Sequence, residues 1–398
     1  MPGRAGRGTV SDMTANLTEV LIAGGGVAGL ETLLALRDLA GDRVHVSMLA
    51  PEPDFVYRPL GTAEPFSLGH PPRRPLWQIA DELGATLIAD GLAEVRPGTR
   101  EVRCTSGTVL PYDALVVTLG AVSEPLEHTT TFVGEGAREA MGGVLADLEQ
   151  GYSRSVAFVA PSEGWTLPLY ELAILTAREV WAMGMDDVRF SLVTPEERPL
   201  GIFGEYASTA IAELLAAERI EFVGSTSADG GLPDADRVVA LPRLRGPAVR
   251  GLPADGAGFI PVDAHGRVAG LEDVYAAGDA TDFHIKQGGL STQQADAVAE
   301  MIAQRAGAPV DPQPFRPVLR GLLLTGDRDR YLLSASEEAG GFRGYSDEQP
   351  LWWPPTKMAG RYLAPYLYAG AKPALAANEP DAAHLLVETK VALGAGRA

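Results

Sequence analysis

The sequence predicts an α/β protein that contains two dinucleotide-binding units and a C-terminal capping region. Segments 18–49 and 155–194 each show the order buried strand, turn, helix, strand, which is typical of a right-handed parallel crossover. A glycine-rich turn follows the first strand, and segment 274–281 reads as a further strand that ends in Gly-Asp. Because the two units start about 135 residues apart, we interpret the second as an internal repeat of the first.

The individual strands and helices follow from local patterns. An apolar run at 18–23 precedes the glycines of 24–29 and a helix that is expected to end near Gly41. Short β-rich runs bounded by turn formers follow along the chain. Further strands are expected at 44–49, 85–89, 101–110, 114–118, 155–160, 188–194, 238–241 and from 274, with helices at 169–183 and within 283–303.

Composition excludes several classes of function. The 398 residues are 46% apolar and 21% charged, which is typical of a globular protein of two or three domains. With 33 basic and 52 acidic residues the net charge is −19, so nucleic acid and anionic lipid are unfavourable partners. Six scattered histidines and one cysteine predict no metal site. Because no apolar run approaches the ~18 residues of a spanning helix, we expect a cytoplasmic protein.

The most informative motif is Gly24-x-Gly26-x-x-Gly29, which follows a strand and opens a helix. In such a motif the first glycine permits a tight turn, the second lets the backbone approach a pyrophosphate, and the third allows close helix–strand packing. The N–H groups at the helix start, where Ala28 lies, then face the diphosphate. We therefore predict a dinucleotide site at these four residues, with a plain glycine-rich turn as the alternative.

The ribose position of this motif departs from the usual pattern. An acidic residue near the end of the second strand normally binds the ribose hydroxyls. By spacing this position is Ala50, and the nearest carboxylate is that of Glu52. Either Glu52 reaches the ribose, or water and the backbone near Ala50 hold it.

Two more motifs, Gly278-Asp279 and Thr118-Leu119-Gly120, follow in a specific order. With the glycine motif they resemble the pyridine nucleotide-disulfide oxidoreductase superfamily over roughly residues 17–330. The resemblance implies two Rossmann-like domains of the FAD/NAD(P)-binding fold and bound FAD, with Asp279 on its ribityl chain and pyrophosphate. The implied organisation is a mobile leader (1–16), an FAD-binding domain in two parts (17–122 and 255–325), an NAD(P)-binding-like domain (123–254) and a capping region (326–398).

The same resemblance implies further residues at the flavin. A helix start would point its N-terminus at the flavin N1–C2=O edge and stabilise negative charge on the reduced ring. Lys286 would add a positive charge, unless it is a solvated lysine. Glu171 matches a carboxylate beside the flavin, unless it is an ordinary first-turn acid, and these two are the candidate catalytic residues. The helix start is formed by Gln287, Gly288, Gly289 and Leu290.

Within the superfamily the sequence resembles the sulfide:quinone oxidoreductase and type II NADH dehydrogenase branch. The shared features are the segment FVYRPL and the aromatic, proline-containing segment 352–370. The branch implies FAD contacts from Arg58 and Pro59, and adenine contacts from the backbone of Leu92 and Ala93. Segment 352–370 would cap the flavin and an acceptor pocket. The alternatives for it are packing between domains, a dimer contact, or shallow membrane contact.

The second unit lacks an equivalent glycine motif. Aligned on the triplet Glu171-Leu172-Ala173, the three glycine positions fall on Gly164, Thr166 and Leu169. A leucine at the close-packing position and Pro168, which has no N–H donor, are both unfavourable for pyrophosphate binding. We therefore expect a degraded nicotinamide site.

The single cysteine, Cys104, excludes a redox-active disulfide within the chain. Disulfide reductases need a CxxxxC pair, and several related families use a cysteine beside the flavin. Cys104 belongs to the predicted EVRCTSGTVL hairpin and matches none of those positions. We interpret it as a structural cysteine.

The sequence thus predicts an FAD-dependent oxidoreductase that passes electrons from a reduced small-molecule or protein donor to a quinone or another acceptor. One alternative is an NAD(P)H:acceptor reductase, which would bind nucleotide through Gly164 and either Glu196 or Arg198. Another is a non-catalytic subunit that binds flavin or a partner. A homodimer is common for this architecture.

Overall fold

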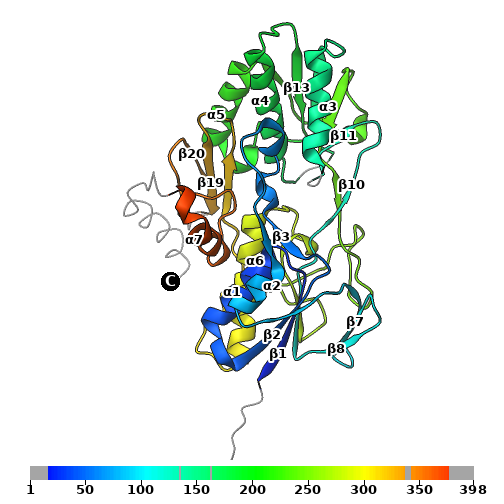
Figure 1. The fold of residues 1–398 in the computed structure, drawn as a ribbon, viewed down its shortest axis with the longest axis vertical. Coiled ribbons are helices and arrows are strands. Elements are labelled where there is room, and N and C mark those ends of the chain that lie inside the picture. Colours follow the sequence, from blue (N-terminus) through cyan, green and yellow to red (C-terminus); the bar gives the residue numbers. More distant parts are fainter. Residues whose placement is uncertain (1–16, 134–135, 162–163, 337–341, 376–398) are drawn as a thin grey trace, which may run out of the picture.

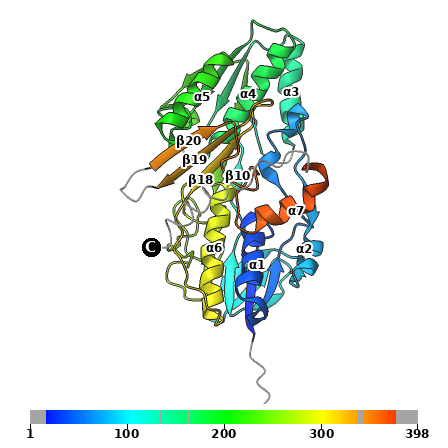
Figure 2. The same cartoon turned by 90° about the vertical axis from the view of Figure 1, so that its left-hand side faces the viewer.

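The computed structural model describes residues 17–133, 136–161, 164–336 and 342–375, so the expected leader lies outside the described residues. Two parallel five-stranded sheets, one towards each end of an elongated molecule, form the body of the protein (Figure 1). A three-stranded antiparallel sheet lies beside the boundary between them (Figure 2).

The first sheet is built around the N-terminal strand, and all its strands are parallel. Across the sheet its strands are β17 (Val274–Ala276), β9 (Ala114–Val117), β1 (Thr18–Ala23), β2 (Val44–Leu49) and β5 (Thr86–Ile88). In the central strand, Ile22 is in register with Met48 on one side and with Val116 on the other. Strands β9 and β17 are apolar or aromatic and buried over their whole length, as is β1 from Val20 to Ala23, because both faces of the sheet are covered there.

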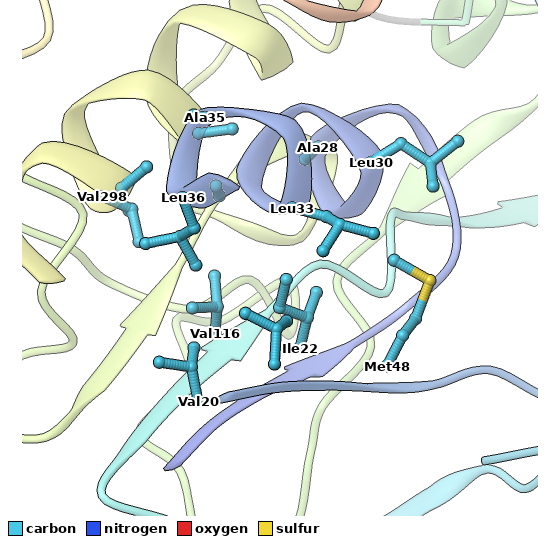
Figure 3. Close-up of a cluster of buried hydrophobic side chains, with 14 of the residues drawn as sticks. Val20, Ile22, Ala28, Leu30, Leu33, Ala35, Leu36, Met48, Val116 and Val298 are labelled. Carbon is cyan, nitrogen blue, oxygen red and sulfur yellow. The ribbon is translucent and has the colours of Figure 1, made fainter. Parts of the chain in front are cut away.

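Two helices lie side by side on one face of this sheet (Figure 3). They are α1 (Val27–Leu39) and α6 (Gly288–Arg305). Leu33 and Leu36 of α1 and Val298 of α6 are fully buried in one cluster with Ile22 and Met48. This core fixes the start of α1 at the carboxyl edge of the sheet, where a glycine turn joins it to β1.

The second sheet repeats the order of four strands of the first, and differs in its edge strand, which precedes the other four in the chain instead of following them. Its strands are β11 (Thr130–Thr131), β15 (Arg237–Ala240), β12 (Ser155–Val159), β13 (Arg189–Val193) and β14 (Ile220–Val223), all parallel. Helices α3 (Ala137–Glu149), α4 (Leu167–Ala182) and α5 (Glu205–Ala217) flank it. Phe158 and Tyr170 are fully buried in its core. The predicted internal repeat is therefore present.

Short elements connect these units. Beside the first sheet lie β3 (Asp54–Val56), η2 (Arg58–Leu60), η3 (Glu64–Phe66), β4 (Arg73–Pro75) and α2 (Leu76–Glu82), and an antiparallel sheet of β6 (Leu92–Arg96), β7 (Glu101–Cys104) and β8 (Val109–Pro111). β10 (Val122–Glu124) pairs with β16 (Arg243–Arg245) where the chain passes between the units. Most predicted strands are confirmed. The predicted hairpin at 101–110 is also confirmed, and it turns at Gly107, whose φ is +94°.

The C-terminal elements lie against both units. They are β18 (Leu319–Leu323), β19 (Arg330–Ser336), β20 (Phe342–Asp347) and α7 (Leu363–Leu375). The segment 356–363, which we call the strap, runs from the second unit to the first and leads into α7. Within the described part of the chain, every helix is too short or too polar to cross a membrane.

Candidate cofactor site

The turn from β1 to α1 forms a cradle that only glycines permit. Gly24 has a φ of +122°, and a Cβ there would lie 2.3 Å from the carbonyl oxygen of Thr118. A Cβ on Gly29 would lie 2.1 Å from the carbonyl oxygen of Gly24. In contrast, a Cβ on the exposed Gly26 would have no atom within 4 Å. Gly24 and Gly29 thus allow close packing, whereas Gly26 leaves open space over the helix start.

The donors at the start of α1 face this open space. Gly26 is the N-cap residue, no side chain caps the helix, and its first turn holds no acidic residue. The first N–H groups of an α-helix have no partner within the helix, and the helix dipole adds positive charge at this end. A diphosphate satisfies these donors. The cradle therefore fits the diphosphate group of FAD.

The loop after β17 forms a wall beside the cradle. Gly278 has a φ of +79°, and a Cβ there would lie 3.0 Å from the Cβ of Ala28 in the first turn of α1. Its N–H donates to Gln294 Oε1 at 2.7 Å. The next residue, Asp279, accepts a hydrogen bond from Ser291 Oγ at 3.3 Å, and burial raises the pKa of its carboxyl. This carboxyl is thus placed beside the helix start that would hold the diphosphate.

Lys286 is held inside the protein rather than extended into solvent. Its Nζ lies 3.6 Å from the ring centroid of Phe259 and donates to the carbonyl oxygen of Thr281. Burial lowers the pKa of this lysine to about 8, while the charge of Asp279 acts in the opposite direction. Lys286 is thus half-buried and packed against the protein, and its role at the flavin remains a prediction.

The start of α6 is only partly available to a ligand. The side chain of Gln287 is the N-cap, and its Oε1 accepts the N–H of Leu290 at 2.8 Å. Its Nε2 donates to the carbonyl oxygen of Arg320 at 3.0 Å. The N–H of Leu290, which was expected to face the flavin, is therefore used by the cap, because the N-cap glutamine competes for the same donor.

A buried ion pair joins the second unit to the strap. Glu171, the fifth residue of α4, is fully buried, and its Oε2 binds Lys357 Nζ of the strap and accepts Thr62 Oγ1 at 2.6 Å. Its Oε1 accepts the N–H of Leu324 at 2.9 Å. Lys357, with 7% of its side chain exposed, also donates to Thr62 Oγ1 at 3.0 Å. Burial raises the pKa of Glu171 and lowers that of Lys357, and their attraction opposes both shifts.

The strap continues over the start of α6. The N–H of Met358 donates to Tyr57 Oη at 2.8 Å, and the carbonyl oxygen of Ala359 accepts Thr292 Oγ1 at 3.0 Å. A Cβ on Gly288 would lie 3.2 Å from Met358 Cγ. A Cβ on Gly289 would similarly lie 3.2 Å from the carbonyl oxygen of Ala359. The two glycines therefore serve the packing of the strap.

The strap ends on a second buried carboxyl. Glu31, the fifth residue of α1, accepts the N–H of Tyr362 at 2.8 Å and that of Leu363 at 2.6 Å. Burial raises the pKa of Glu31 to about 7. On α6, burial and the neighbouring Glu31 raise the pKa of Asp296 as well. Glu31 thus holds the end of the strap beside another carboxyl.

No hydrogen bond or ion pair between described residues places the predicted ribose and adenine contacts at the cradle. Ala50 is buried, and its N–H donates to Ile88, whereas Glu52 is exposed. Leu92 and Ala93 lie on β6, where the register shifts between residues 92 and 94. These ribose and adenine contacts remain predictions.

The predicted contacts Arg58, Pro59 and Gly120 also remain untested. Arg58 is exposed and lines a cleft at the boundary of the two units, and Pro59 lies beside it in η2. Gly120 has a φ of +72°, and a Cβ there would meet no atom within 4 Å. The left-handed backbone at Gly120 explains the glycine of this motif.

The turn that opens α4 is filled by side chains. Thr166 is 3% exposed, Leu167 1% and Leu169 0%. Pro168 occupies the first turn of the helix, where a missing N–H is tolerated. Only Gly164, with a φ of +149°, keeps the glycine geometry. These side chains occupy the turn where a pyrophosphate would bind.

The residues considered for residual NAD(P)H binding are also engaged. Glu196 Oε2 accepts Tyr170 Oη at 2.6 Å, and burial raises the pKa of this carboxyl. Arg198 forms an ion pair with Glu205 at 3.6 Å. Neither side chain is therefore fully available for a ribose or its phosphate.

Cys104 is buried in β7, and burial raises the pKa of its thiol. A raised pKa disfavours the thiolate that redox chemistry requires. Among the described residues, no group of three or more His, Cys, Asp or Glu side chains could hold a metal ion.

Taken together, the paired sheets, the glycine turn and the Gly-Asp loop have the fold of the pyridine nucleotide-disulfide oxidoreductase-type flavoproteins. The sulfide:quinone oxidoreductase of the hyperthermophilic bacterium Aquifex aeolicus is similar with a TM-score of 0.71 and 19% identity, over 83% of this chain and 87% of that chain. An NAD-dependent persulfide reductase from A. fulgidus gives a TM-score of 0.58 and 16% identity, over 80% and 64% of the two chains.

A ferredoxin reductase of the CYP199A2 system from Rhodopseudomonas palustris gives a TM-score of 0.57 and 19% identity, over 80% of this chain and 83% of that chain. Neither the protein-family models nor the curated proteins match the sequence. At these identities the similarity establishes the fold, and the predicted fold class is confirmed.

Three residues of the site were not identified from the sequence. Lys357 could have been suspected because it is one of only two cations, with Arg361, in the aromatic, proline-containing segment 352–370. Thr62 and Glu31 carry no sequence signal, since their importance comes from contacts with residues more than 100 positions away.

Proposed function

We propose that the protein is an FAD-dependent oxidoreductase that passes electrons from a reduced donor to a quinone or another acceptor, without a redox-active disulfide. The open cradle at the start of α1, with Asp279 beside it, supports this proposal most directly. FAD, when bound, would supply the electron-transfer chemistry.

The residues of the cradle would bind and orient this cofactor. The first N–H groups of α1, from Val27 and Ala28, would bind the diphosphate. The Asp279 carboxyl would accept hydrogen bonds from the ribityl hydroxyls. The charge of Lys286 would oppose the rise in the pKa of Asp279 that burial causes.

The ion pair of Glu171 and Lys357 would provide a fixed charge pair at the flavin. Three hydrogen-bonding partners hold Glu171 in place, so the ammonium of Lys357 cannot move freely. Both groups are buried, and a pair that is kept out of water acts more strongly on its surroundings than an exposed pair. Both residues would act electrostatically, by holding a fixed pair of charges beside the flavin.

The donor that we propose is not a nicotinamide nucleotide. The filled turn at Thr166–Leu169 and the engaged Glu196 support this choice. The donor and acceptor are small molecules or protein carriers. Among the similar structures, a sulfide:quinone oxidoreductase and a ferredoxin reductase are named for one example of each kind.

The test is an anaerobic titration of the purified protein, followed by its flavin absorbance. We expect a yellow protein whose flavin stays oxidised in stoichiometric NADH and NADPH and is bleached by dithionite. Rapid bleaching by either nucleotide would instead support an NAD(P)H:acceptor reductase. A colourless protein that releases no flavin on denaturation would support the non-catalytic alternative. Asp279→Ala should release FAD during gel filtration, and full retention would contradict the assigned role of Asp279.

A further inference from the structure

A second cavity opens at the boundary of the two units, apart from the cradle. It is a cleft of about 990 Å³, within the range of about 300–1,000 Å³ that is typical of small-molecule sites. One wall comes from the region of η2, η3 and β4, and the other from the start of α3. Segments 56–73 and 136–139, far apart in the sequence, therefore face one cavity.

Arginine dominates the charged lining of this cleft. Arg58 and Arg73 lie on the first wall and Arg138 on the second, whereas the chain as a whole has a charge of −19. Among the described residues, none forms a hydrogen bond or ion pair with the side chain of Arg58 or Arg138. Guanidinium groups bind carboxylates and phosphates through paired hydrogen bonds.

Two glutamates, Glu64 and Glu139, also line the cleft. Glu64 Oε1 lies 3.3 Å from His70 Nδ1, so its charge faces a residue of the same wall. Glu139 lies in the first turn of α3 and opposes part of the positive charge there. Among the described lining residues Arg73 has an interaction of its own, so Arg58 and Arg138 are the side chains that we consider for an anion.

The start of α3 adds positive potential to the second wall. This helix has 13 residues, its N-cap is Gly136, and no side chain caps it. Gly136 itself lines the cleft, so the N-terminal end of the helix faces the cavity. The helix dipole and the uncapped N–H groups favour an anion at this end.

The cleft also approaches the proposed flavin site. Gly61 lines the cleft, and the next residue, Thr62, binds both Glu171 and Lys357. A ligand in the cleft would thus be separated from the buried ion pair by the thickness of one chain segment.

We propose that this cleft binds a small polyanion, a di- or tricarboxylate or a phosphate compound, between Arg58 and Arg138. We further infer that this anion is the donor or acceptor of the enzyme, and this part rests on the proposed function. The binding of an anion in the cleft does not depend on the proposed function.

The test is calorimetric titration of the FAD-loaded protein with citrate and, separately, with pyrophosphate, to distinguish carboxylate from phosphate. We expect at least one anion to bind. Arg58→Gln and Arg138→Gln should each weaken this binding about 10-fold or more, because each removes a charged donor. Glu139→Gln should strengthen it. The matched control is Arg103→Gln, which removes an exposed arginine of β7 and should leave binding unchanged.

Two results would overturn the inference. One is that neither anion binds to wild-type protein. The other is that binding survives both arginine substitutions and is lost in Gly26→Val, since the anion would then occupy the diphosphate cradle. FAD content is measured in every variant, so loss of the flavin and loss of the anion site are separate readouts. A colourless protein that still binds anion through Arg138 would contradict only the proposed function.

Discussion

The two α/β units share the order of four parallel strands but differ at the turn after their central strand, which opens α1 in the first unit and α4 in the second. In the first unit, Gly26 is exposed and a Cβ there would meet nothing. At the corresponding place in the second unit, Thr166 and Leu169 are buried with the core. The comparison teaches that the sheet and its helices are maintained by the core, whereas ligand binding depends on a few turn positions.

The helix that follows the central strand, α1 in the first unit and α4 in the second, has glutamate as its fifth residue in both units. Glu31 of α1 and Glu171 of α4 are both fully buried, and each binds the strap. Their partners differ, because Glu31 lies beside the Asp296 carboxyl and Glu171 beside the Lys357 ammonium. The repeat therefore extends from the topology to a pair of matched anchoring sites with opposite electrostatic surroundings.

The largest expected effect separates the two turns. Gly26→Val should abolish FAD retention, because its side chain would fill the space for the diphosphate, while the fold is preserved since no protein atom lies nearby. The matched variant Thr166→Val should retain FAD. Flavin content after gel filtration, with circular dichroism as the folding control, measures both. Equal flavin contents in the two variants would contradict the conclusion that the turn of the first unit, and not that of the second, binds FAD.

The second prediction concerns the anchor in the second unit. Lys357→Met leaves the buried Glu171 without its cation, which should lower the free energy of unfolding by about 3–5 kcal/mol. Adding Glu171→Gln should recover much of this loss, because no uncompensated charge remains. Urea denaturation of the single and double variants measures the difference. If the double variant is no more stable than the single one, the pair is not coupled.

The third prediction concerns the anchor in the first unit. The folded-state pKa of Glu31, about 7, is above its usual value of 4.5, so the folded protein binds more protons between these pH values. This contribution to stability is present below pH 4.5 and is lost as pH rises towards 7. Burial and the neighbouring Glu31 raise the pKa of Asp296 as well, so Asp296→Asn removes a second carboxyl of this kind and should reduce the loss of stability between pH 5 and pH 8.

Urea denaturation across this pH range measures the effect of Asp296→Asn, and Asp234→Asn, at an exposed position, is the control. A pH profile that is identical in wild type and in Asp296→Asn would show that Asp296 does not contribute to the pH dependence of stability.

The smallest expected effect is that of Cys104→Ser. The thiol is buried in β7, so the substitution should cost about 1 kcal/mol of stability and leave electron transfer near the wild-type rate. Flavin reduction and reoxidation rates provide the measurement. A large loss of activity with an intact fold would restore thiol chemistry to the mechanism.

Local patterns in the sequence were sufficient for the two sheets and for the cradle. Gly24, Gly26 and Gly29 have a recognisable spacing because a strand–turn–helix unit that approaches a diphosphate needs small residues at these three positions. The loss of the second motif could likewise be read at Thr166 and Leu169. The fixed spacing identifies such a turn even though one of its contacts, from Gly24 to Thr118, is distant along the chain.

The strap contacts could not be predicted in the same way. Lys357 reaches Glu171 across 186 positions, and Leu363 reaches Glu31 across 332. No periodicity or motif records a pairing at such separations. The cleft between Arg58 and Arg138 was missed for the same reason, since its walls meet only after both units have folded.

The strap has a consequence for the order of events during synthesis. Both α/β units are complete by residue 305, the end of α6, but Glu31 and Glu171 lack their strap partners until residues 357–363 emerge from the ribosome. A nascent chain therefore passes through a stage in which the cradle is formed and the strap is not yet bound. Translation order would thus give the proposed FAD a period in which to enter before the last segment closes over the start of α6.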